Sequence, residues 1–193
     1  IGILADESAK ANYIAIDLLS QAEHDEMASS IMITTCEEVA LKTSDEVENY
    51  LKTLSREKIA RTSIENRGAI IVASSMTEAI ELMNEIAPEH LEIMTKNAFE
   101  LLPYIKHAGA IFLGENTPEP IGDYLAGPNH TLPTGSTAKF YSPLNVENFM
   151  KKSSIINFSK NAINELGEAC ALLADTEGLT AHAKSVRVRL ENK

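Results

Sequence analysis

Short apolar runs alternate along this chain with longer segments of helical periodicity, and this alternation limits the fold more than any other feature. The apolar runs are predicted strands, and the segments that follow or precede them are predicted helices. The predicted strands span 30–35, 69–73, 90–94 and 110–113, and the predicted helices span 8–25, 37–55, 76–87 and 96–106. Strands that alternate with helices form βαβ units, so we expect an α/β domain with a mostly parallel sheet covered on both faces. Ser8 is the expected N-cap of the first helix.

The two ends of the chain differ from this α/β domain, which we expect over residues 7–143. The chain opens without Met on Ile1-Gly2-Ile3-Leu4-Ala5-Asp6, which has the character of a buried strand. Residues 1–6 are therefore expected to be the last strand of a truncated upstream domain, in a chain that is part of a longer protein. The tail, residues 144–193, has too few apolar positions for its own core, so we expect it to pack on another body. Within the tail we expect a strand at 153–158 and helices at 160–174 and 178–191.

The charge balance excludes two classes of partner. The chain has 193 residues, with Lys+Arg 17 against Asp+Glu 28 and a net charge of −11. A nucleic-acid surface needs clustered basic residues, and an anionic membrane attracts them as well. The basic cluster at 184–189 fits the last turns of a helix, where cations complement the dipole. Two isolated cysteines, Cys36 and Cys170, and the lack of a long apolar run are typical of a reduced cytoplasmic protein.

Residues 114–143 form a long segment rich in Gly, Pro, Asn and Thr without periodicity. Long loops in compact domains are usually functional or disordered. Its aromatic residues favour an ordered, functional loop. The stretch from Gly122 to His130 places Asp123 and His130 among glycines, which let backbone approach a ligand closely, and so suggests a metal or polar substrate. The alternative, a plain turn, does not explain the density of Asp, Asn and His.

Two further pairs of polar residues are candidates for chemistry. Gln21 and His24 are three residues apart on a helix, close enough to share a metal ion. The alternative is a histidine stabilised at a helix C-terminus. Glu89 and His90 lie at the start of a predicted strand, where an imidazole can serve as a general base. Strand alternation would separate their side chains unless the backbone turns at Pro88; the alternative is a capping Glu and a buried, satisfied His.

Glu177 and His182 lie near the start of the last predicted helix. Asp175 and Thr176 make a good N-cap region. The alternative for Glu177 is therefore an acidic residue that stabilises the start of the helix. His182 has an equally plain alternative as a surface residue.

Five segments, taken in order, resemble the histidinol dehydrogenase family over the whole chain. They are ADESA (5–9), LLSQAEHD (18–25), APEHLEI (87–93), GDYLAGPNHTLPT (122–134) and EGLTAH (177–182). The resemblance implies zinc-dependent oxidation of L-histidinol to L-histidine through histidinal, with two NAD. It also implies incomplete Rossmann-like domains and a homodimer in which the C-terminal tail crosses to the partner subunit.

The resemblance also implies roles for individual residues. The zinc ligands would be Gln21, His24, Asp123 and His182. His90 would be the general base on the substrate hydroxyl, and Glu89 would activate water for the second oxidation. The substrate contacts would be these ligands together with Glu89, His90, His130 and Glu177.

The chain departs from the family in length. The family's chains are much longer, and most NAD contacts precede the ADESA segment, so no NAD-binding residue is predicted here. Three alternatives stay open: a related dehydrogenase of another small alcohol, a zinc hydrolase with Glu89 as base, and a non-catalytic fragment that dimerises.

Overall fold

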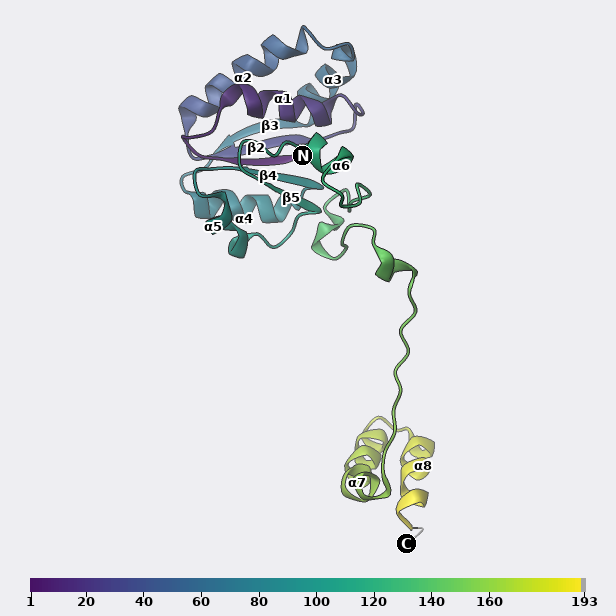
Figure 1. Cartoon of the computed structure of the whole chain (residues 1–193). Helices are drawn as coiled ribbons and strands as arrows, with labels where there is room; N and C mark the ends of the chain where they lie inside the picture. Colours follow the sequence, from purple (N-terminus) through teal and green to yellow (C-terminus); the bar gives the residue numbers. More distant parts are fainter. Residues whose placement is uncertain (192–193) are drawn as a thin grey trace. The chain divides into compact units, whose positions relative to one another are not determined.

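The computed structural model describes residues 1–191, which fall into two compact units (Figure 1). The first unit spans Ile1–Phe149 and the second begins at Met150. The division therefore falls slightly later than the predicted boundary between residues 143 and 144. Among the described residues, no helix is both long enough and apolar enough to cross a membrane.

A five-stranded parallel sheet forms the centre of the first unit. Its strands are β1 (Gly2–Ala5), β2 (Ser30–Thr34), β3 (Gly68–Val72), β4 (His90–Met94) and β5 (Ala110–Leu113). They lie in the order β3-β2-β1-β4-β5, with every pairing parallel. This is the order of a doubly wound sheet, so the prediction of a parallel, Rossmann-like α/β fold is confirmed. The prediction that residues 1–6 are the last strand of an upstream domain is wrong, because β1 is the central strand of this sheet and pairs with both β2 and β4.

Helices cover both faces of the sheet (Figure 1). One face carries α1 (Ala11–Ala22), α2 (Glu37–Leu51) and α3 (Glu57–Arg67), and the other carries α4 (Met76–Ile86) and the short α5 (Ala98–Leu101). Successive strand residues point to opposite faces, so Ile3 joins the core under α1 and α2 while Leu4 joins the core over α4. The two cores fix the ends of α1 and β4 relative to each other, and both elements carry site residues.

Local hydrogen bonding explains where the helices differ from the predicted ranges. Ser8 is not an N-cap, because its backbone N–H and hydroxyl both donate to Asp6 and the helix begins only after Lys10. The predicted helix at 96–106 is reduced to α5 and a 3₁₀ turn, η1 (Leu102–Tyr104), which contains Pro103. Proline lacks the N–H that would continue an α-helix.

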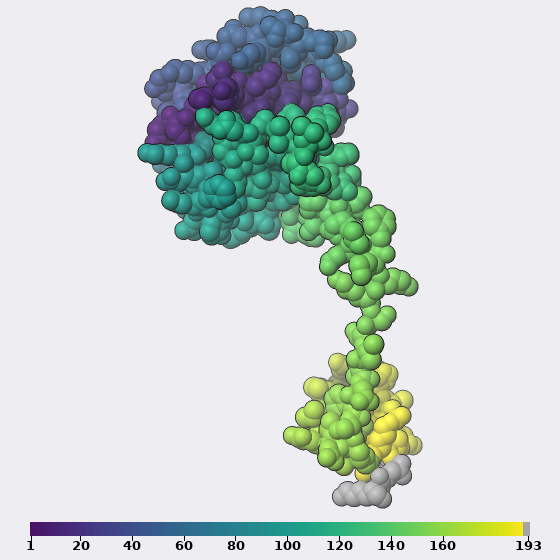
Figure 2. Space-filling model, viewed as in Figure 1, coloured from purple at the N-terminus to yellow at the C-terminus, as the bar shows by residue number. Residues whose placement is uncertain are grey.

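The segment after β5 contains one short α-helix and two 3₁₀ turns: α6 (Glu119–Tyr124), η2 (Thr137–Lys139) and η3 (Val146–Phe149). The green part of Figure 2 shows it on the surface of the first unit, beside the purple N-terminal residues and the teal residues that precede it. The predicted ordered loop therefore includes a helix that sequence periodicity did not reveal.

The second unit consists of two helices, α7 (Lys160–Thr176) and α8 (Thr180–Glu191). Ser159 caps α7 by accepting a hydrogen bond from the N–H of Ala162, and Arg187 of α8 pairs with Glu168 and Asp175 of α7. The predicted strand at 153–158 is wrong, because this segment has no regular structure. A strand needs a neighbour for its backbone hydrogen bonds, and the described part of the second unit supplies none.

Candidate active site at the amino end of the sheet

Four of the polar residues singled out in the sequence lie near one another at the amino ends of the parallel strands: Gln21, Glu89, His90 and Asp123. His90 is the first residue of β4, and Gln21 lies in the last turn of α1, which runs back along the sheet after β1. Figure 1 shows α6 at this same edge, next to the N-terminus. Doubly wound sheets usually bind ligands at the opposite, carboxyl edge. The site is therefore built from helix ends and loop residues that return to the start of the strands.

The imidazole of His90 is the centre of the cluster and is only 4% exposed. Its Nδ1 lies 3.2 Å from Gln21 Oε1 and 3.8 Å from Glu119 Oε1. Its Nε2 lies 3.6 Å from Asp123 Oδ1 and has no hydrogen-bond partner among the described residues. Burial lowers the pKa of His90 to about 4, against the opposing effect of Asp123. The ring is therefore neutral near pH 7 and can accept a proton.

The short helix α6 brings two carboxylates to this imidazole. Glu119 and Asp123 are four residues apart, so they lie on one helix face. Glu119 is 3% exposed, and burial raises its pKa to about 7. Sequence reasoning missed Glu119 because it treated residues 114–143 as irregular. The four-residue spacing of Glu119 and Asp123 was the signal that could have identified it.

Glu89 reaches the same neighbourhood through a turn before β4. Ala87 adopts a left-handed conformation with φ 49°, and Pro88 follows it, which agrees with the turn predicted at Pro88. Burial raises the pKa of the half-buried Glu89, and the nearby Asp123 adds to that effect. Glu89, in the bend before β4, and His90, the first residue of β4, therefore both interact electrostatically with Asp123.

His24 lies at the margin of the cluster. It follows α1, is exposed, and its carbonyl accepts a hydrogen bond from Arg56. Its imidazole acts electrostatically on both Glu89 and His90. Among residues 1–191, the group of His, Cys, Asp and Glu whose ligand atoms lie within 4.8 Å of one another is His90, Glu119 and Asp123. A gathering of Gln21, His24 and Asp123 around one ion stays a prediction.

The remaining predicted residues lie apart from this cluster in the chain. His130 is exposed in the segment after α6. Glu177 is the exposed C-cap of α7, and His182 is exposed in the first turn of α8. Glu177 and His182 thus belong to the second unit, and their roles stay predictions.

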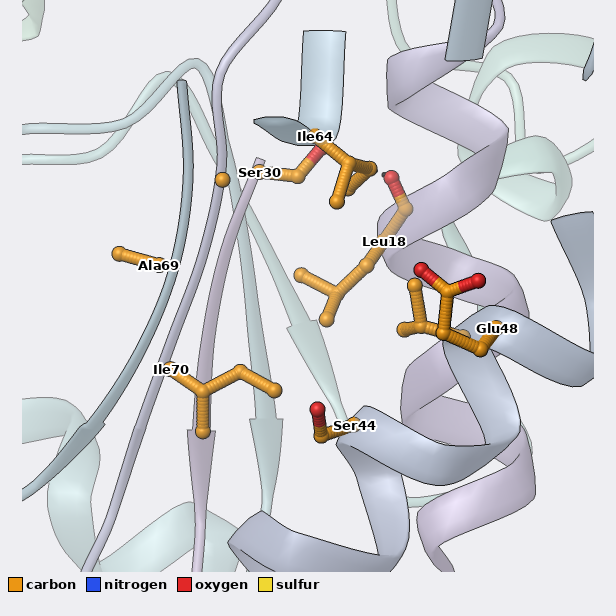
Figure 3. A pocket seen from close by; sticks show the side chains of 9 residues that line it. Leu18, Ser30, Ser44, Glu48, Ile64, Ala69 and Ile70 are labelled. Carbon is orange, nitrogen blue, oxygen red and sulfur yellow. Dashed lines mark hydrogen bonds between the residues drawn. The ribbon is translucent and has the colours of Figure 1, made fainter. Parts of the chain in front are cut away.

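Two cavities differ in their suitability for a small molecule. A cleft of about 490 Å³ beside the cluster is lined in part by Gln21 and Glu89, and its size is typical of ligand sites. A smaller pocket of about 230 Å³ lies between α1, α2 and the β3 edge (Figure 3). In this pocket the Ser30 hydroxyl donates to the carbonyl of Leu18, and the Glu48 carboxylate accepts from Arg61. These two polar groups therefore already have hydrogen-bond partners. The cleft beside Gln21 and Glu89 is the better candidate.

Gly109 offers a test of how tightly the backbone of Glu89 is held. A Cβ at Gly109 would lie 2.5 Å from the carbonyl oxygen of Glu89, whose position is fixed by the N–H of Ala110. Backbone cannot yield as a flexible side chain does, so Gly109→Ala is expected to destabilise the protein by about 1–3 kcal/mol. Urea unfolding of both proteins measures this change. Unchanged or increased stability would show that the start of β4 adapts freely.

The comparisons with known proteins all point to one family. The family model for histidinol dehydrogenase matches residues 1–190. Histidinol dehydrogenase of Sulfurimonas denitrificans is 71% identical over 190 residues, which is 98% of this chain and 44% of that protein. The enzyme of Wolinella succinogenes is 67% identical with the same coverage. The crystal structure of histidinol dehydrogenase from Elizabethkingia anophelis is 37% identical with a TM-score of 0.89, over 98% of this chain and 44% of that one.

This chain thus spans less than half the length of the relatives that it matches. The family model spans residues 1–190, and the solved structure covers 98% of the chain. The chain belongs to the histidinol dehydrogenase family.

Proposed function

We propose that this chain carries the acid–base and metal-binding half of a histidinol dehydrogenase, which oxidises L-histidinol to L-histidine through histidinal with two NAD. The observation that carries the proposal is the buried, neutral imidazole of His90, surrounded by Gln21, Glu119 and Asp123 with Glu89 adjacent. This arrangement supplies a proton acceptor, His90, and a carboxylate, Glu89, which lines the cleft together with Gln21. The family membership supports the choice of substrate and a role in histidine biosynthesis, and the proposal includes a cytoplasmic location.

The residues present suit a zinc ion. Gln21, His24, Asp123 and His182 would hold it, and they offer the nitrogen and oxygen ligands that zinc accepts. Two buried polar atoms beside Asp123, His90 Nε2 and Glu119 Oε2, have no hydrogen-bond partner in the described part of the chain, which is consistent with a further group binding there. When bound, zinc would anchor and polarise the nitrogen and oxygen atoms of the substrate.

The protein's own groups divide the two oxidation steps between them. His90 would accept the proton of the hydroxyl group that is oxidised, on the alcohol in the first step and on the hydrated aldehyde in the second, while NAD serves as the hydride acceptor in both steps. Nδ1 lies near the oxygens of Gln21 and Glu119, which favours its N–H form and leaves Nε2 as the basic nitrogen. Glu89, with its pKa raised by burial, would take a proton from the water that adds to the aldehyde. His130 and Glu177 would contact the substrate.

The remaining parts of the proposal concern the partner chain and the dinucleotide. A homodimer with an exchanged tail would bring His182 and Glu177 to the site. The NAD contacts would come mainly from residues outside this chain.

The test is the reduction of NAD by the full-length protein with L-histidinol, with histidinal and with other small amino alcohols. We expect NADH formation with the first two, loss of activity on chelation, and recovery on adding zinc. Asp123→Ala should abolish zinc retention, measured by metal analysis, whereas the control Asp25→Ala should retain zinc. Hydrolysis without NADH would favour a zinc hydrolase, and oxidation of another alcohol alone would favour a related dehydrogenase.

A further inference from the structure

A buried carboxyl group beside His90 takes no part in the proposed reaction steps. Glu119 is 3% exposed, and its Oε2 has no hydrogen-bond partner among the described residues. Its Oε1 lies 3.8 Å from His90 Nδ1, which is too long for a hydrogen bond but close enough for one to form after a small side-chain movement. Buried polar groups without a partner are rare in folded proteins, so Glu119 is a candidate for a further role.

Two contacts hold α6, and with it Glu119, beside the imidazole. Glu92 Oε1 accepts a hydrogen bond of 2.9 Å from the N–H of Glu119, the first residue of α6. Gly122 of the same helix packs so closely on Phe112 of β5 that a Cβ at this position would overlap the ring. Phe112 in turn lies beside His90, with the ring centroids 5.9 Å apart. The Glu119 carboxyl group therefore stays within reach of Nδ1.

The present partner of Nδ1 is Gln21 Oε1, at 3.2 Å. A glutamine also binds a metal ion through this oxygen, because its amide nitrogen is a donor only. Coordination draws electron density from a carbonyl oxygen, so Gln21 would then be a poorer acceptor for the Nδ1–H. Glu119 is the better acceptor in that state, because a hydrogen bond to an ionised carboxylate is stronger than one to a neutral amide.

We propose that Glu119 is a positioning residue, which accepts the Nδ1–H of His90 whenever Gln21 Oε1 binds the proposed metal ion. The proton then stays on Nδ1 and Nε2 stays the basic nitrogen while Gln21 changes its partner. In this role Glu119 touches neither the substrate nor the metal. The part played by zinc rests on the proposed function. The choice of Glu119 as the second acceptor rests on its place beside Nδ1.

Removing the two acceptors one at a time tests this role without a metal. In the full-length protein freed of zinc by chelation, Gln21→Met and Glu119→Met should each keep the proton on Nδ1, because the other residue accepts it. In the double variant the proton should move to Nε2, which lies 3.6 Å from Asp123 Oδ1. NMR of protein with isotope-labelled histidine distinguishes protonated from unprotonated ring nitrogens, and His90→Asn identifies the signals.

Zinc should make Glu119 necessary. In the zinc-loaded protein, Glu119→Met should move the proton to Nε2 and lower kcat by about tenfold or more, because a histidine in the wrong tautomer cannot accept the proton of the hydroxyl. Glu119→Gln should recover most of this loss, since its amide oxygen can accept the Nδ1–H. Metal analysis should find the zinc content of the parent protein in both variants. The control Glu100→Met, at an exposed position of α5, should keep kcat within about threefold.

Each outcome bears on one part of the proposal. A proton that leaves Nδ1 in zinc-free Gln21→Met, or stays there in the double variant, would overturn the role of Glu119. If the double variant does not fold, Gln21→Met alone decides. Loss of zinc from both Glu119 variants would make Glu119 a metal ligand and overturn the positioning role. A parent protein that retains no zinc or does not oxidise histidinol would refute the proposed function, and the zinc-free comparison would still decide whether Glu119 is the second acceptor.

Discussion

Replacing His90 by Asn in the full-length protein is expected to lower kcat by about 10²–10⁴ with both histidinol and histidinal, which is the usual loss for a general base. The reason is that His90 presents a neutral, buried ring nitrogen at the centre of the cluster. Glu89→Gln is expected to spare the oxidation of histidinol and to slow the oxidation of histidinal, because only the second step needs an activated water. Supplying the aldehyde directly and comparing its rate with that of the alcohol separates the two steps.

A matched control is available in His107, which follows η1 and lies outside the cluster around His90. His107→Asn should leave both rates within about threefold of the parent protein. Equal losses on the two substrates for Glu89→Gln would contradict the division of roles. A normal rate for His90→Asn would show that another group accepts the hydroxyl proton.

The strands could be predicted almost to the residue, because short apolar runs flanked by polar residues leave little choice. The helix α3 could not be predicted, because Glu57–Arg67 is strongly polar and buries only Ala60 and Ser63. Its place is set by packing beside α1 and β3 rather than by a pronounced apolar stripe. The strand predicted at 153–158 failed for the opposite reason, because β-rich composition forms a strand only where another strand can pair with it.

The candidate site could be predicted only in part. The resemblance predicted roles for Gln21, His90 and Asp123. In the structure, Gln21 Oε1 lies 3.2 Å from His90 Nδ1, and Asp123 Oδ1 lies 3.6 Å from His90 Nε2. Glu92 could not be recognised from pattern, because a single acidic residue in a short strand is normally assigned to a solvent-facing position. Only the fold shows that Glu92 is buried and accepts a hydrogen bond from the backbone N–H of Glu119.

The second prediction with a large effect concerns the second unit, α7 and α8 with the segment before them. Leu172, Leu173 and Phe158 are exposed there, and burying such side chains is favourable, so another surface is expected to cover them. Exchange of identical elements between two chains is a low-cost way to provide that surface. His182 lies on this unit and Asp123 on the first one, so each proposed metal site would then combine residues from both subunits.

Mixed dimers of the full-length protein test this exchange. His182→Ala and Asp123→Ala homodimers should both be inactive, because each site lacks one ligand. In a mixed dimer one site would receive both replacements and the other none, so about half of the parent activity should return. The measurement is NADH formation by mixed dimers purified with two different affinity tags, and a control made from His182→Ala chains carrying both tags should stay inactive. If verified mixed dimers recovered no activity, each chain would have to complete its own site, because intact residues on separate chains could then not combine.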